Sequence, residues 1–329
     1  MAKTQNVGAV AAAAGALAAV GLLVVMMLVV GTRPAEATFP GPNGKIAYHA
    51  DDGEFPGGID SEIYTIAPTG GMPFQVTDND TEDGSPDYSP DGTKIAYSAS
   101  DGNDSEIYII EATGGTPFQV TNNDTSDYNP SYSPDGTKIA YTCHGVQEAG
   151  IYNDPEICTI KATGGTPFQV TNNIKDDTDP EYSPDGKKIA YVSIDPEFWG
   201  AAKEIYTINV GGGGKTKVTN DDTDNGSPSY SPNGKRIAYH SYDGTDWEIF
   251  TINVGGGGGK FNLTSTNAKD EFDPDYSPNG KRIAYSGSSL TNPTGTGYEI
   301  YTIGVGGGGK TRVTNNDTGD SHPSWGRRP

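Results

Sequence analysis

The decamer YSPDGTKIAY occupies residues 88–97 and returns unchanged at residues 132–141. Close copies are YSPDGKKIAY at 182–191 and YSPNGKRIAY at both 230–239 and 276–285. The Pro-Asp-Gly or Pro-Asn-Gly centre favours a tight turn, because proline presets φ and glycine accepts positive φ. Isoleucine and tyrosine on its far side favour a strand. The decamer therefore predicts a strand, a turn and a second strand, repeated along the chain.

Two further anchors recur with the decamer. Its final tyrosine occurs six times, at intervals of 44–50 residues, as Tyr48, Tyr97, Tyr141, Tyr191, Tyr239 and Tyr285. Each is followed by a Glu-Ile pair and then by Val-Thr or Leu-Thr. One unit thus holds four short strands, which we name a to d and which resemble SPDYS, KIAYS, EIYTI and FQVT. Four strands in a unit of this length are typical of propeller blades.

The two ends of the chain complete each other. The first unit starts at PNGKIAY (42–48) and lacks strand a, whereas SHPSWG (321–326) is a strand a with no unit after it. Pairing the last strand into blade one would close the ring and remove a sheet edge. We therefore predict an all-β, six-bladed propeller of four-stranded blades, forming one domain over residues 38–329.

The repeat P-x-Y/W-S-P-D-G-x-K-I-A-Y, followed by E-I-Y, G-G and V-T, resembles the repeats of TolB-like six-bladed β-propellers. The resemblance covers residues 42–326 and implies this fold. It implies little about function, because such propellers serve as binding proteins, as appendages of peptidases and as parts of lyases. The small α/β domain that precedes the propeller in TolB has no counterpart here, so the resemblance is to the propeller alone.

The first 37 residues differ from the rest. An uncharged apolar run spans residues 8–31 and is followed by Ala35-Glu36-Ala37, which has the small-x-small form of a signal-peptidase site. We expect a signal peptide cleaved after Ala37 and export to the periplasm, the cell surface or the medium. The alternative is an uncleaved N-terminal membrane anchor, since the run is long enough to span a bilayer. Only that alternative would involve a membrane.

Charge narrows the choice of partner. The formal net charge is −21, which disfavours binding to nucleic acid. The d–a and b–c connections of a propeller lie on one face, and here they are acidic, as in TNNDTSDYN (121–129) and SASDGNDSE (98–106). The a–b and c–d connections carry 15 of the 20 basic residues that follow the leader, including Lys94, Lys138, Lys310 and Arg312. We expect an acidic face that binds a protein, a peptide or a cationic ligand.

Strand a lines the channel of such a propeller, so its variable residues are candidate ligand contacts. The residues before the strand-a proline are Ser85, Asn129, Asp179, Ser227, Asp273 and His322. Two positions later lie Asp87, Ser131, Glu181, Ser229, Asp275 and Ser324. These positions vary between blades while the turn residues do not, which is the pattern of a constant scaffold with a tuned surface. The alternative is that Asp and Ser before proline cap turns.

Two acidic loops are candidate Ca²⁺ sites. Asn220, Asp222 and Asp224 alternate, as do Asp78, Asp80 and Glu82, and oxygen ligands at every second position suit Ca²⁺. Neither loop has the glycine and glutamate of an EF-hand, and Asx turns explain the same pattern. We expect no required cofactor, with Ca²⁺ as the candidate ion.

Other motifs are weaker. GVGGGGKT (304–311) matches a phosphate-binding loop, but it joins strands c and d where a helix would be needed, so we expect no nucleotide. His49 and His240 share one repeat position, with His144 nearby, and we expect these three to lie too far apart to share a metal. No G-x-S-x-G or H-E-x-x-H motif is present.

The only two cysteines, Cys143 and Cys158, fall on neighbouring strands b and c of blade three. Antiparallel neighbours can bring their Cα atoms within disulfide range, and export permits the bond. Our leading hypothesis is thus an exported, non-catalytic binding protein that uses its acidic face and channel mouth. The alternatives are an extracellular hydrolase or lyase acting on a polymer in the channel, and a structural envelope module.

Overall fold

The computed structural model describes residues 41–51, 60–144, 154–194, 202–256, 258–266, 269–288, 297–316 and 318–329. The chain divides into two compact units, Met1–Glu36 and Ala37–Pro329, and every described residue belongs to the second. The predicted signal peptide and its cleavage site lie outside the described residues. Those residues form strands and turns without a helix, and so contain no helix suited to crossing a membrane.

Twenty-four strands form six antiparallel sheets of four. Blade one contains β24 (Asp320–Arg327), β1 (Asn43–Asp51), β2 (Ser61–Ile66) and β3 (Phe74–Gln75). Blade two contains β4 (Asp83–Tyr88), β5 (Lys94–Ser100), β6 (Ser105–Glu111) and β7 (Phe118–Gln119). Blade three contains β8 (Tyr128–Tyr132), β9 (Lys138–His144), β10 (Pro155–Lys161) and β11 (Phe168–Gln169).

The other three blades follow the same order. Blade four contains β12 (Asp176–Tyr182), β13 (Lys188–Ile194), β14 (Glu204–Asn209) and β15 (Thr216–Lys217). Blade five contains β16 (Asn225–Tyr230), β17 (Arg236–Tyr242), β18 (Trp247–Asn253) and β19 (Phe261–Asn262). Blade six contains β20 (Glu271–Tyr276), β21 (Arg282–Ser288), β22 (Tyr298–Gly304) and β23 (Thr311–Arg312).

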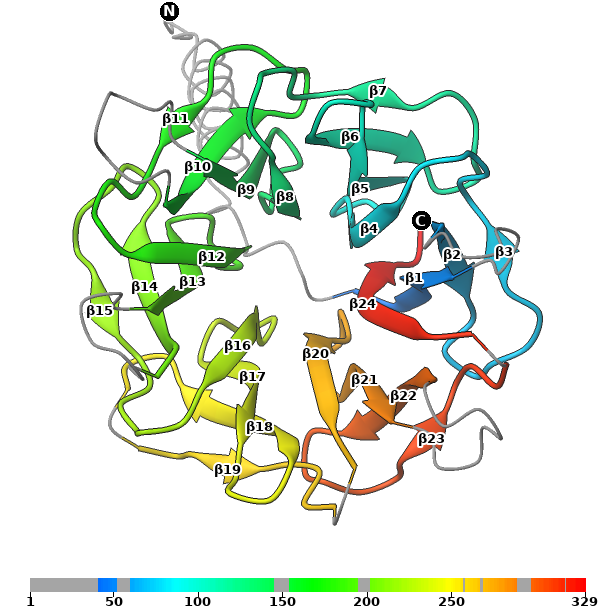
Figure 1. Cartoon of the computed structure of the whole chain (residues 1–329). Helices are drawn as coiled ribbons and strands as arrows, with labels where there is room; N and C mark the ends of the chain where they lie inside the picture. Colours follow the sequence, from blue (N-terminus) through cyan, green and yellow to red (C-terminus); the bar gives the residue numbers. More distant parts are fainter. Residues whose placement is uncertain are drawn as a thin grey trace, which may run out of the picture. The chain divides into compact units, whose positions relative to one another are not determined.

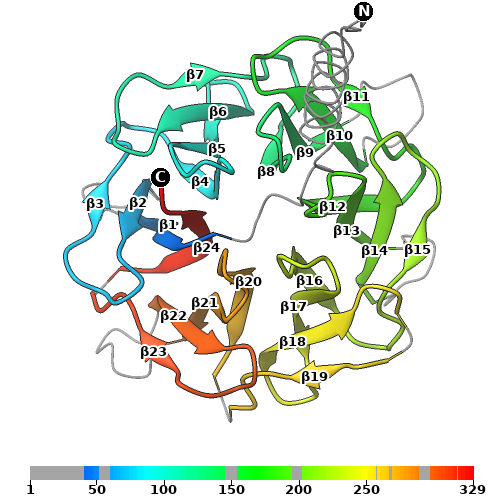
Figure 2. The ribbon, with the colours of Figure 1, turned by 180° about the vertical axis from the view of Figure 1, so that it is seen from behind.

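The six sheets surround a common centre, with β24, β4, β8, β12, β16 and β20 innermost (Figure 1). Figure 2 shows the same ring from behind, with the two-residue strands d at its rim. The C-terminal strand β24 pairs with β1, and Trp325 lies opposite Ile46. The predicted six-bladed propeller and its closure by the last strand are therefore confirmed.

The Ile-Ala-Tyr triplet of strand b explains how blades stack. Successive side chains of a strand point to opposite faces, so Ile95 and Tyr97 face one way and Ala96 the other. Ile95 and Tyr97 pack in one core cluster with Ala47 of blade one, whereas Ala96 packs with Tyr141 of blade three. The large side chains of each blade thus meet the small alanine of the blade before it, and this contact recurs around the ring.

The turn within the decamer is a structural unit. Ser89 Oγ donates to Asp91 Oδ1 at 2.7 Å, and the amide of Gly92, at φ 73°, donates to the carbonyl of Ser89 at 2.8 Å. Lys94 N donates to Ser89 Oγ at 2.9 Å. The turn satisfies its own polar groups, so its repetition reflects construction of the blade.

Candidate functional site

The six residues that precede the strand-a prolines share an unusual backbone. All have φ between 45° and 54°, the left-handed region that residues other than glycine seldom occupy. A β-bulge shifts the register of the inner strand at each of these positions. Asn, Asp and His tolerate this conformation better than most residues, and they fill four of the six positions. They are Ser85, Asn129, Asp179, Ser227, Asp273 and His322.

These residues form the mouth of the channel. A cavity of about 120 Å³ is lined by all six together with five residues of the second predicted set, namely Asp87, Glu181, Ser229, Asp275 and Ser324. A smaller cavity of about 50 Å³ lies on the far side of those carboxyls and is lined by residues such as Tyr88 and Pro90. The structure therefore brings the predicted channel residues together as two rings. We call them the outer ring and the inner ring.

The outer ring is partly joined by hydrogen bonds between blades. Ser85 Oγ donates to Asn129 Oδ1 at 2.8 Å, and Asn129 Nδ2 donates to Asp179. On the other side, Ser227 Oγ donates to Asp273 Oδ1 at 2.8 Å. His322 completes this side, with Nδ1 3.5 Å from Asp273 Oδ2.

Two further histidines lie behind the outer ring. His49 stacks on His322 with ring centroids 4.9 Å apart, and Nδ1 of His240 lies 4.0 Å from Asp273 Oδ1. Burial, with the charge of His322, lowers the pKa of His49 to about 3. Burial lowers that of His240 to about 4. Both imidazoles are thus neutral at physiological pH. The sequence singled out these two residues through their shared repeat position, but not their approach to the mouth.

The two outer-ring aspartates differ in acidity. Burial raises the pKa of Asp179. Burial acts on Asp273 in the same direction, but electrostatic interactions with the nearby His322 and His240 side chains and the Ser227 hydrogen bond outweigh it, so its pKa is lowered. The alternative of a hydrolase or lyase would be favoured if His322, Asp179 and Asp273 converged on one point in the channel. Among the described residues, these three do not form a group of ligand atoms within 4.8 Å of one another.

The inner ring alternates acid and serine. Ser131 Oγ donates to Glu181 Oε2 at 3.1 Å, and the pairs Ser229–Asp275 and Ser324–Asp87 repeat the contact at 3.0 and 3.2 Å. Burial raises the pKa of Asp87 to about 7 and that of Asp275 to about 6. Burial and the other two acids raise the pKa of Glu181 well above its usual range. The inner ring is therefore a threefold set of carboxyls that keep their protons to a higher pH than ordinary carboxyl groups do.

The lining of the mouth is short of positive charge. Among the described residues that line the cavity, five are carboxylic acids, one is a histidine and none is lysine or arginine. An ammonium or guanidinium group entering the cavity would thus meet several hydrogen-bond acceptors and little electrostatic repulsion.

The predicted separation of charge between the faces is wrong for part of the basic set. Several c–d and strand-d cations extend along the blade and pair with acids at its other end. These pairs are Lys217–Glu204, Lys260–Asp221, Lys310–Glu271 and Arg312–Glu299. Long stems lie along aromatic rings on the way, as where Lys310 Nζ lies 4.7 Å from the Tyr301 centroid. The a–b turns keep the lysines assigned to them.

The loops predicted to hold Ca²⁺ are exposed. Asn220 Oδ1 accepts from Lys217 Nζ at 3.0 Å, and Asp224 Oδ1 accepts from the amide of Lys203 at 2.8 Å. Asp222 is exposed beside them. Asp78, Asp80 and Glu82 are exposed in the equivalent loop, which leads into blade two. Neither set is among the described groups of three or more acids that could share an ion.

The remaining motifs are accounted for by the fold. Segment 304–311 connects β22 and β23, and its amides bond within the loop, as where Gly307 N donates to Gly304 O at 2.8 Å. A disulfide joins Cys143 of β9 to Cys158 of β10, with Cα atoms 5.8 Å apart. His144 of β9 has Nδ1 2.9 Å from Ser126 O, whereas His49 and His240 belong to β1 and β17 in other blades.

Comparison with known proteins agrees with the architecture. Residues 42–155 and 146–328 match the family described as the TolB beta propeller domain. No curated protein sequence matches the chain. TolB from Acinetobacter baumannii is 23% identical with a TM-score of 0.70, and the match covers 92% of this chain and 70% of that one.

Two other solved structures are also similar. Putative TolB from Agrobacterium tumefaciens is 20% identical with a TM-score of 0.64, covering 85% of this chain and 91% of that one. Hydrazine synthase of Kuenenia stuttgartiensis is 16% identical with a TM-score of 0.70, covering 88% of this chain and 47% of that one. At such identities the likeness concerns the fold.

Proposed function

The chain belongs to the TolB beta propeller domain family, and from that premise we propose that it is a non-catalytic binding protein whose channel mouth receives a cationic group of a protein or peptide. The observation that carries the proposal is the composition of the mouth. Five carboxylic acids and one histidine line a cavity of about 120 Å³ to which no described lysine or arginine contributes.

The size and charge of the cavity favour one inserted side chain. A lysine or arginine side chain, or a free N-terminal amine, offers several donors to the acceptors of the outer ring. Asp273 is the strongest candidate partner, because its lowered pKa keeps it ionised, and Asp179 lies in the same ring. The acidic d–a loops around the mouth would steer such a ligand, and the association should weaken as salt is added.

The strained backbone of the outer ring also supports the channel mouth as the binding site. Residues held at positive φ without being glycine cost of order 1–3 kcal/mol each and persist where the surroundings impose them. Here six such residues face one cavity. A rigid ring of this kind holds its side chains in place before a ligand arrives, which reduces the entropy lost on binding.

The disulfide and the family indicate an extracytoplasmic protein. We propose export by the leader, with the propeller acting in the periplasm, at the cell surface or in the medium. Cell fractionation with an antibody to the propeller, combined with N-terminal sequencing, tests both the location and cleavage after Ala37.

The binding proposal is tested with equal-length peptides that carry one lysine, arginine, citrulline or norleucine among otherwise uncharged side chains. Each peptide is prepared with a free and with an acetylated N-terminus. Fluorescence anisotropy at low and high salt measures affinity for the parent and for Asp273→Asn and Asp179→Asn. Asparagine suits these positions, because Asn129 fills the equivalent place in blade three.

Among the acetylated peptides, we expect the lysine or arginine peptide to bind and the citrulline and norleucine peptides to fail, and either variant to weaken binding at least tenfold. Asp91→Asn is the matched control, because it removes one carboxylate from an a–b turn where Asn233 and Asn279 are native. Equal losses for Asp91→Asn and Asp273→Asn, or no preference for a cationic peptide, would contradict the proposal.

A further inference from the structure

Every blade buries a glutamate at the start of its strand c. Their exposed fractions are 5% or less, and they are Glu62, Glu106, Glu156, Glu204, Glu248 and Glu299. A buried carboxylate needs a compensating positive charge, a proton or strong hydrogen bonds. The six blades differ in how they provide it.

Blades four and six provide a cation from strand d. Lys217 Nζ lies 3.0 Å from Glu204, and Arg312 pairs with Glu299. The two cations occupy the same register position, opposite Tyr206 and Tyr301 respectively. In these two blades the residue two places before the glutamate is uncharged, being Ala202 in blade four.

The other four blades differ from blades four and six both in strand d and in the residue two places before the glutamate. At the register position of Lys217 they carry an amide side chain, namely Gln75, Gln119, Gln169 and Asn262. Two places before the glutamate they carry an additional acid, namely Asp60, Asp104, Asp154 and Asp246. A blade whose strand d lacks a cation therefore carries an additional acid beside its buried glutamate. This acid adds to the negative charge that must be compensated, and a cation bound from solution would compensate it.

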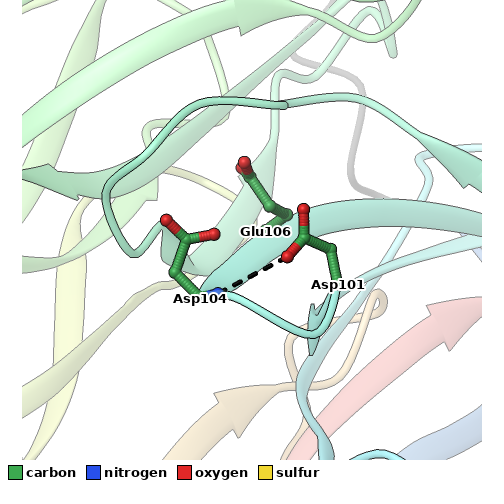
Figure 3. Close-up of side chains that lie close together, drawn as sticks. All are labelled: Asp101, Asp104 and Glu106. Atoms are coloured by element: carbon green, nitrogen blue, oxygen red, sulfur yellow. Dashed lines mark hydrogen bonds between the residues drawn. The ribbon is translucent and has the colours of Figure 1, made fainter.

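Blade two shows this arrangement most fully. Asp101, Asp104 and Glu106 each place one carboxylate oxygen within 4.8 Å of the others (Figure 3). Glu106 is 0% exposed, and its Oε2 is buried without a hydrogen-bond partner, as is Oδ1 of Asp104. Asp127, which is 1% exposed, adds a fourth acid beside Glu106.

An ordinary turn explains only part of this cluster. Asp101 Oδ1 accepts from the amides of Asn103 at 2.9 Å and Asp104 at 3.4 Å, which is an Asx turn. That turn accounts for Asp101, but it leaves the unpartnered oxygens of Asp104 and Glu106 without a role. Blade five repeats the spacing D-G-x-D-x-E, and Asp243, Asp246 and Glu248 form the second such group among the described residues. There the glutamate accepts hydrogen bonds from Thr264 Oγ1 and the amide of Thr266.

We propose that the b–c loops of blades two and five each bind a divalent cation, with Ca²⁺ as the preferred ion, in the place that Lys217 and Arg312 fill in blades four and six. Three carboxylate oxygens are hard ligands of the kind that Ca²⁺ selects. Ligands at 2.3–2.6 Å from a shared Ca²⁺ can lie up to roughly 5 Å apart, so the observed spacing fits the ion. This inference does not depend on the channel mouth.

The first experiment counts ions. The purified protein is stripped with EDTA, and uptake of Ca²⁺ and of Mg²⁺ is measured by isothermal titration calorimetry alongside the melting temperature. We expect Ca²⁺ to raise the melting temperature of the parent. Asp104→Asn should remove one bound ion per chain or weaken the binding of that ion at least tenfold, and Asp246→Asn should do the same for blade five. In blade five, Trp247 adjoins the ligands in sequence, so excitation of tryptophan should sensitise Tb³⁺ emission that Asp246→Asn abolishes.

The second experiment introduces into blade two the strand-d cation that blade four has. Gln119→Lys places an ammonium at the register position of Lys217, so it should abolish ion uptake at blade two and raise the melting temperature in EDTA. Gln119→Met is the matched control, because it has similar length without charge and should keep the ion. Equal ion counts with equal affinities for the parent and Asp104→Asn would overturn the proposal, since the acids of blade two would then hold no ion.

Discussion

Nδ1 of His322 lies 3.5 Å from Oδ2 of Asp273, so the last strand of the chain meets blade six at the channel mouth. The two residues occupy equivalent repeat positions and the same left-handed backbone conformation. This contact exists only because β24 has closed the ring, so it links the binding site to the closure of the fold.

The His322–Asp273 pair should stabilise the closed ring. Because the folded pKa of Asp273 is lowered, its contribution is present above the ordinary aspartate pKa and is lost as pH falls through the lowered value. We expect Asp273→Asn and His322→Asn to show a coupling energy of about 1–2 kcal/mol at pH 5 in a double-mutant cycle by urea unfolding. The coupling should shrink at pH 3, and a coupling of zero at pH 5 would contradict it.

At the positions with a left-handed backbone, glycine and β-branched replacements should differ in their effect on the free energy of unfolding. Ser85 has φ 50°, which glycine adopts without strain and valine does not. We expect Ser85→Val to lower the free energy of unfolding by about 2–3 kcal/mol and Ser85→Gly by less than about 1 kcal/mol. Both variants lose the same hydroxyl, so the difference isolates the backbone. Equal midpoints in urea would show that the bulge relaxes.

The inner ring should make the protein more stable in mild acid. Asp87, with a folded pKa of about 7, and Asp275, with about 6, hold protons that the unfolded chain releases above about pH 4. The free energy of unfolding should thus fall as pH rises from about 4 through about 7, by at least about 1 kcal/mol between pH 5 and 8.

Other buried acids with a raised pKa, such as Asp320, also make the protein more stable at lower pH. A variant of the inner ring separates its contribution from theirs. Glu181→Gln should flatten the dependence on pH, because it removes one titrating group and relieves the other two. Asp91→Asn should leave the slope between pH 5 and 8 unchanged, because the pKa of Asp91 is lowered. Identical slopes for Glu181→Gln and the parent would refute this role of the ring.

The disulfide of blade three should contribute measurable stability. Cys143 and Cys158 are 15 residues apart, and closing a loop of this size is worth about 3 kcal/mol in the chain-entropy account. The double variant Cys143→Ser, Cys158→Ser should lose about 2–3 kcal/mol in urea unfolding. Dithiothreitol should lower the stability of the parent and leave the double variant unchanged. Equal sensitivity of both proteins would argue that the bond is absent.

Much of the fold could be predicted because each blade repeats one pattern. The Ile-Ala-Tyr triplet, the Pro-Asp-Gly turn and the isolated strand around Trp325 together predict the number of blades and the closure. The channel residues could also be located, since a constant turn sets the position of the variable residues before it. The left-handed backbone at those residues could not be foreseen, because a residue before proline ordinarily prefers extended conformations.

Side-chain reach was harder to predict. Lys310 and Arg312 were assigned to one face from their position in the chain, but their stems extend toward glutamates at the other end of the blade. The acids of the D-G-x-D-x-E loops were likewise visible as letters, whereas the alternating loops near Asp78 and Asp222 drew attention as cation ligands. Each D-G-x-D-x-E loop ends in a buried glutamate, which the alternating loops lack, and that burial depends on packing in the folded blade.

The sequence by itself determined the blade, its repetition six times and the closing strand, because these depend on local periodicity and turn chemistry. Only the tertiary structure decided which charges are compensated. Glu204 has Lys217, Asp273 has His322, and Glu106 has other carboxylates. The energy of a buried charge depends on the neighbours that desolvate or pair it, and in a propeller those neighbours come from strands and blades far apart in the chain.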